Sequence, residues 1–139
     1  MAKSFLYRFF GAGKISPLIL EEFSTSDLLF KEEGLSATVT YRDFRCKGRY
    51  SNWRRQWVTV SLLLTSEQLI LFCYSKKIID IELSDERILS LNISQLDSGR
   101  LQISFDASLF NPECSGTIEY IINSDETDKF IDSFMDNRL

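Results

Sequence analysis

Histidine is absent from this chain of 139 residues, which also has only three cysteines and two prolines. Its absence removes the usual general base near neutral pH, the Ser-His-Asp relay and the usual zinc nitrogen ligand. Cys46, Cys73 and Cys114 are odd in number, far apart and never in C-x-x-C spacing. We therefore expect small buried cysteines in a reducing compartment, with no disulfide framework, no metal and no cofactor.

Long apolar runs are also missing. No stretch reaches the length of about 18 apolar residues that a transmembrane helix needs. The first residues, MAKSFLYRFFGAGK, resemble a signal peptide, but Arg8 interrupts a short apolar run and no small-residue cleavage site follows. The prediction is a cytoplasmic protein.

Charge is distributed unevenly. The chain carries 20 acids against 16 bases, a net charge of −4, which disfavours general nucleic-acid binding. Residues 42–55 nevertheless hold six cations and one acid, Asp43. The cations of this basic window are Arg42, Arg45, Lys47, Arg49, Arg54 and Arg55. The window is the strongest indication of a ligand in the sequence.

The hydrophobic pattern divides the chain near residue 34. Residues 1–33 are predicted to form an N-terminal helical extension, with a short helix over 2–10, a second after Pro17 and a turn around 28–30. From Gly34 onward apolar residues recur with period two, and a one-residue slip between Tyr41 and Phe44 predicts a β-bulge. Strands are expected over 34–46, 58–64, 68–74, 79–83, 89–93, 100–106 and 116–123, followed by a helix over 125–138.

Seven short antiparallel strands and one amphipathic helix have few packing solutions. We expect a mainly β domain over residues 34–139, a partly open barrel or orthogonal sandwich with the helix packed across one mouth. Residues 46–57 would then be the joint between the first and second strands.

Several segments resemble the pleckstrin-homology-like (PH-like) superfold, particularly its bacterial and GRAM-like branch. They are R-x-x-x-W-R-R-Q-W-V-T-V at 49–60, L-T-S-E-Q-L-I-L-F at 64–72, K-K-I-I-D-I-E-L at 76–83 and S-G-T-I-E-Y-I-I-N at 115–123. The resemblance covers roughly residues 34–139 and implies a seven-stranded barrel with a C-terminal helix. The chain departs from it at Phe130 and Phe134, where that family has a tryptophan, and at Gln56 and Trp57, which replace the basic end of its phosphoinositide signature.

Two interpretations of the basic window stay open. Arg45, Lys47, Arg49, Arg54 and Arg55, together with Trp53, suit an anionic lipid headgroup, a phosphorylated ligand or an acidic partner. The simpler interpretation is a solvated hairpin tip.

The N-terminal stretch has the same ambiguity. Phe5, Phe9 and Phe10 lie on one helical stripe beside three cations. They suit either a membrane interface or packing on a sheet face or on a second subunit.

The function predicted from these features is a non-catalytic binding module. A protein partner or a homo-oligomer is favoured, and an anionic membrane surface or phosphorylated ligand is the alternative. An enzyme using Asp80, Glu82 and Asp106 is a distant third, because outward acids on strands are ordinary solubilising residues. Neither nucleic acid nor metal is expected as a partner.

Overall fold

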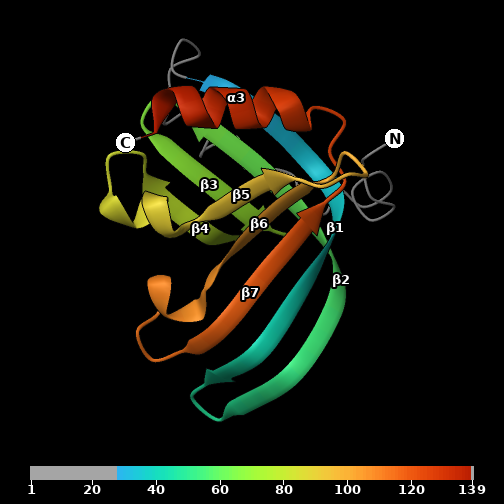
Figure 1. The fold of residues 1–139 in the computed structure, drawn as a ribbon, viewed down its shortest axis with the longest axis vertical. Coiled ribbons are helices and arrows are strands. Elements are labelled where there is room, and N and C mark those ends of the chain that lie inside the picture. The colour runs from blue at the N-terminus through green and yellow to red at the C-terminus, as the bar shows by residue number, and fades with distance from the viewer. Residues whose placement is uncertain (1–27, 139) are drawn as a thin grey trace.

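The computed structural model describes residues 28–138, a curled antiparallel half-barrel with one C-terminal helix (Figure 1). In chain order the elements are β1 (Leu28–Cys46), β2 (Arg49–Thr65), β3 (Gln68–Cys73), β4 (Lys76–Glu82), the 3₁₀ helix η1 (Glu86–Ser90), β5 (Asn92–Gln95), β6 (Leu101–Asp106), the 3₁₀ helix η2 (Ala107–Leu109), β7 (Ser115–Ile122) and α3 (Thr127–Asn137). The prediction of seven antiparallel strands and one terminal helix is confirmed.

One long strand holds the sheet together. The strand order is β4-β3-β2-β1-β7-β6-β5, and every pairing is antiparallel. β1 pairs with β2 over nearly its whole length and with β7 from Ala37 onward. Because β1 is shared, the two halves of the sheet curl around one main core. A smaller buried cluster of Leu63, Ile70 and Phe72 is separate from it.

The core lies inside this curl, under α3. Inward residues of β1, β2, β6 and β7 alternate with outward ones, as period-two patterning requires. α3 contributes Phe130 and Phe134, both almost fully buried, and the Phe130 ring meets Phe30 edge-on at 5.2 Å. The helix therefore closes one end of the half-barrel, and the β1–β2 hairpin extends at the opposite end (Figure 1).

The predicted β-bulge is present in β1. The register of β1 on β7 shifts by one residue between Arg42 and Arg45, and Asp43 has a positive φ of 49°. Tyr41 and Phe44 consequently share one side, with ring centroids 5.0 Å apart. Gly116 faces the bulge with φ of 102°, and a Cβ there would lie 2.5 Å from the Asp43 carbonyl oxygen. Only glycine fits this position.

Three boundary predictions were wrong. Residues 28–33 belong to β1 and not to a helical extension; the bulge between Glu32 and Leu35, with Gly34 at φ 69°, interrupts the alternation that would have revealed the strand. Most of 46–57 is strand, because only residues 47 and 48 form the turn. Residues 86–90 are η1, so β5 is only four residues long. The helices predicted within 1–27 lie outside the described residues.

Candidate functional site

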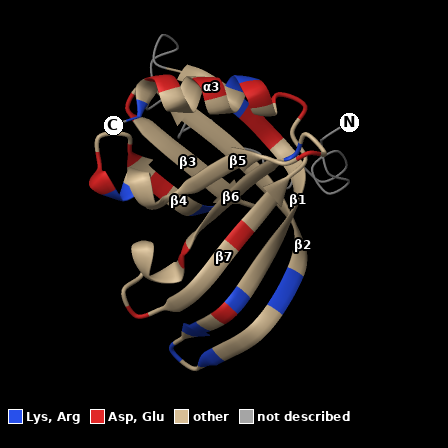
Figure 2. Ribbon diagram, viewed as in Figure 1, with Lys and Arg blue, Asp and Glu red and all other residues tan. Residues whose placement is uncertain are grey.

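The basic window forms the free end of the β1–β2 hairpin, which we call the arm (residues 42–57). The first part of β2, from Arg49 onward, extends past the end of β3, which pairs only with the part of β2 from Val60 to Leu64. The Lys47–Gly48 turn lies at the tip, where Gly48 supplies a φ of 75°. Lys and Arg residues are concentrated at this end of the two strands, away from α3 (Figure 2).

The six residues predicted to bind an anion all lie on the arm, and all are exposed: Arg45, Lys47, Arg49, Trp53, Arg54 and Arg55. Among the described residues, none of the five cations in this set forms an ion pair. Arg42 differs, because its guanidinium lies 3.1 Å from the Glu119 carboxylate on β7. The structure thus brings the predicted residues together and leaves their charge available.

Aromatic rings hold three of the guanidinium groups in place. Arg45 lies 4.8 Å from the Tyr50 ring centroid, Arg54 5.1 Å from that of Tyr41, and Arg55 5.2 Å from that of Trp53. Such cation–π contacts orient the planar guanidinium while its edge N–H groups stay accessible. The arm therefore presents charges that are oriented without being neutralised.

The two faces of the arm differ in composition. Trp53, Arg55 and Trp57 alternate along the outer face, where the Arg55 Nε donates to the Thr40 hydroxyl at 3.0 Å. Trp57 and Trp53 are 77% and 57% exposed. Such exposure is unusual for large aromatic rings, which are highly buried on average.

The inner face of the arm borders a cavity of about 350 Å³. Tyr41, Phe44, Arg49, Tyr50 and Arg54 are among the residues that line it. Burial raises the pKa of the Tyr41 hydroxyl, and the nearby Arg54 guanidinium partly opposes this shift. Tyr41 is therefore a neutral hydrogen-bonding group at neutral pH.

A second cavity, of about 300 Å³, adjoins the first at Tyr41 and Phe44. Lys76 and Lys77, the first two residues of β4, line it together with Phe110 and Cys114 of the segment before β7. From the sequence these lysines were expected only between the strands predicted over 68–74 and 79–83. No local signal could have placed them here, because the curl of the sheet brings the two segments together.

The cysteine prediction was wrong for two of the three residues. Cys46 and Cys114 form a disulfide across 68 positions, with Cα atoms 4.3 Å apart. Arg45 pairs with Ser115 in the β1–β7 ladder. Cys46, which follows Arg45, therefore lies beside Cys114, which precedes Ser115. Cys73 is free, and burial raises the pKa of its thiol.

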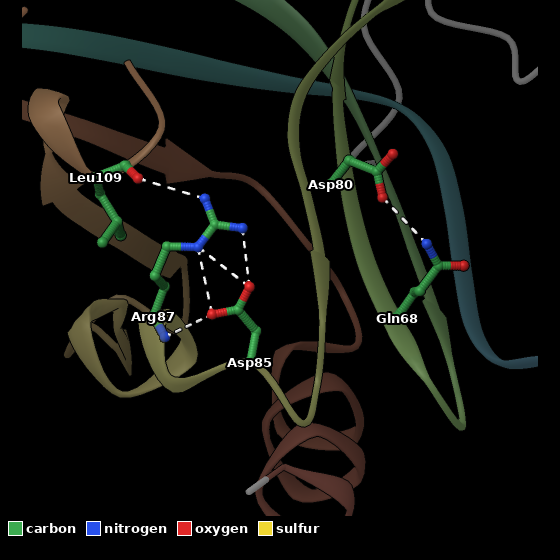
Figure 3. A network of polar contacts seen from close by, with 5 residues as sticks. All are labelled: Gln68, Asp80, Asp85, Arg87 and Leu109. Carbon is green, nitrogen blue, oxygen red and sulfur yellow. Dashed lines mark hydrogen bonds and ion pairs between the residues drawn. The ribbon is translucent and has the colours of Figure 1, made fainter. Parts of the chain in front are cut away.

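Two of the three carboxylates considered for catalysis, Asp80 and Asp106, have structural contacts. Asp80 accepts from the Gln68 side chain at 3.2 Å (Figure 3). Its carboxylate also lies 3.5 Å from the Lys77 ammonium. Asp106 accepts the backbone N–H of Ser108 and so caps η2. Within residues 28–138, no three His, Cys, Asp or Glu side chains form a group suited to a metal ion.

A second contact shown in Figure 3, between Asp85 and Arg87, stabilises η1. Asp85 accepts from the backbone N–H and the guanidinium of Arg87, which also donates to the Leu109 carbonyl oxygen at 3.5 Å (Figure 3). These hydrogen bonds hold the pKa of Asp85 below its ordinary value. The contact joins η1 to η2, so it supports the fold at a distance from the arm.

The predicted interaction surface at Phe5, Phe9 and Phe10 lies outside the described residues. Among residues 28–138, no helix combines the length and apolar character needed to cross a bilayer. The cytoplasmic location stays a prediction.

Comparisons with known proteins identify no relative. The chain matches no family model, no curated protein and no solved structure.

Proposed function

We propose that this protein is a non-catalytic binding module that engages an acidic partner protein through the arm. The observation that carries the proposal is the group of five exposed cations on the arm, which have no ion-pair partner among the described residues. Unpaired, ring-supported arginines suit carboxylate oxygens, which accept two parallel N–H donors.

Membership of the PH-like superfold is part of the same proposal. Its support is the all-antiparallel order of seven strands and the C-terminal helix that closes one end of the half-barrel, both of which the sequence resemblance implies. The arm, and not the fold, indicates the kind of partner, because a fold alone does not determine a ligand.

The charge distribution favours an oriented encounter. The segment 125–138, which includes α3, carries five acids and two bases, and it lies at the end opposite the arm (Figure 2). An acidic partner is therefore attracted to the arm and repelled from the helix end. Arm-to-arm pairing of two copies would oppose like charges, so a homo-oligomer through this surface is disfavoured.

The proposal is tested with fluorescein-labelled oligoglutamate as the probe. Arg54→Glu with Arg55→Glu should weaken binding by about tenfold, because two lost ion pairs and two new repulsions of similar size, at roughly 0.2–1 kcal/mol each, together cost about 0.8–4 kcal/mol. Lys129→Glu with Arg138→Glu on the α3 end makes the same change of net charge and should leave binding within about threefold of wild type. Equal losses in both double variants would show that only total charge matters.

An anionic membrane surface is the second candidate, and one observation favours it. Tyr50, Trp53 and Trp57 are exposed beside the cations, and indole and phenol rings prefer the bilayer interface. Co-sedimentation with phosphatidylserine vesicles, and not with phosphatidylcholine vesicles, would support this candidate. Co-sedimentation should disappear in the Arg54→Glu, Arg55→Glu variant.

A further inference from the structure

We propose that the arm binds its acidic partner as an added β-strand along the open edge of β2, residues 49–57. This inference rests on the proposed function and adds the way in which the partner is held. Its first support is the sheet topology: β1 pairs along one side of this segment, and no described strand lies along the other. An edge of this kind presents a row of unpaired N–H and C=O groups.

The end of β3 opens the edge at a defined point. Among the residues that the structure describes, the last backbone hydrogen bond on that side is the Tyr74 N–H donating to the Thr59 carbonyl at 2.8 Å. Tyr74 then adopts a positive φ of 57° and begins the turn toward β4, so β3 leaves β2 there. From Trp57 to Arg49 the edge is clear of described strands, and every residue except the half-buried Ser51 is exposed.

The side chains along this edge determine which strand fits. Trp53, Arg55 and Trp57 lie on one face, and Arg54 and Gln56 on the other. Side chains of an added strand would stand beside these rows, so acids opposite the arginines are favourable and like charges are unfavourable. An extended acidic segment is therefore the occupant that the edge selects.

The same arginines disfavour pairing of this edge with a second copy of the chain. Pairing of this edge with its counterpart in a second copy would bring Arg49, Arg54 and Arg55 of each chain together. Cationic side chains are a usual means by which edge strands avoid self-association. The edge thus remains open to an acidic strand and closed to its own copy.

Alternate N-methylation of a probe peptide tests the inference. The parent probe is a nine-residue peptide of alternating glutamate and valine, matched to the length of residues 49–57. In a paired strand only alternate residues direct their N–H toward the neighbour. One derivative is therefore N-methylated at every glutamate and the other at every valine, and isothermal titration calorimetry compares both with the parent.

The expected result is an asymmetry between the two derivatives. One should bind at least about tenfold more weakly than the parent, and the other should stay within about threefold, because only one set of N–H groups faces the edge. Equal binding of both derivatives, or equal loss in both, overturns strand addition. If the Arg54→Glu, Arg55→Glu variant still loses binding in that case, the proposed function stands without it.

Failure of the parent peptide and of oligoglutamate to bind at all would overturn both proposals. Binding of phosphatidylserine vesicles with no peptide binding would do the same, and would assign the arm to a membrane surface.

Discussion

Gly116→Ala should be among the most destabilising glycine substitutions in the described chain. Its added Cβ would lie 2.5 Å from the Asp43 carbonyl oxygen and 2.7 Å from that of Arg42. Both acceptors are backbone atoms of the β1 bulge, so no flexible side chain can move aside. The clash therefore acts on the ladder that joins the arm to β7.

The magnitude has two parts, which a matched control separates. A positive φ costs alanine about 1–2 kcal/mol, and this part also applies to Gly99→Ala, where φ is 87° and nothing lies within 4 Å of the new Cβ. The overlap at Gly116 adds about 1–3 kcal/mol. We expect Gly116→Ala to lower the free energy of unfolding by about 2–5 kcal/mol and Gly99→Ala by about 1–2 kcal/mol.

Urea unfolding followed by circular dichroism measures both values. With a slope of about 2 kcal/mol per molar urea, the two midpoints should differ by roughly 0.5–1.5 M. Equal midpoints for the two variants would contradict the close approach of Gly116 to the bulge, and with it the account of how the arm is fixed.

Three further outcomes follow from the core and the cysteines. Phe130→Ala should cost about 3–5 kcal/mol in urea unfolding, because the ring is 0% exposed, whereas Met135→Ala, 43% exposed, should cost below about 1 kcal/mol. Titration of thiols in denaturant should find one free thiol, Cys73, before reduction and three after, since Cys46 and Cys114 are joined; three before reduction would contradict the disulfide. In the native protein Cys73 should react with a thiol reagent at pH 8 far more slowly than in denaturant, because burial raises its pKa.

Local patterns in the sequence were sufficient to predict the strand count and the bulge. The alternation around Tyr41 and Phe44 slips by one residue, and a bulge is the physical meaning of that slip. The terminal helix was predicted in the same way, from the apolar stripe that includes Phe130 and Phe134.

Features that depend on pairing between segments distant in the chain could not be predicted from the sequence. The Cys46–Cys114 disulfide follows from the register of β1 on β7, which no spacing in the sequence reveals. The strand character of 49–57 was missed because the exposed arm has no buried face, and period-two alternation appears only where one face of a strand is buried. Residues 49–57 were predicted as part of the joint between two strands because they are exposed, and the same exposure makes them a candidate binding surface.

The quenching of tryptophan fluorescence tests the central claim most directly. Both tryptophans of the chain, Trp53 and Trp57, lie on the arm, so tryptophan emission reports on this surface alone. Saturation with the glutamate–valine peptide should reduce acrylamide quenching and shift the emission to shorter wavelength, and Arg54→Glu with Arg55→Glu should abolish both changes. Peptide binding measured by calorimetry with no change in tryptophan quenching would place the site elsewhere and contradict the account.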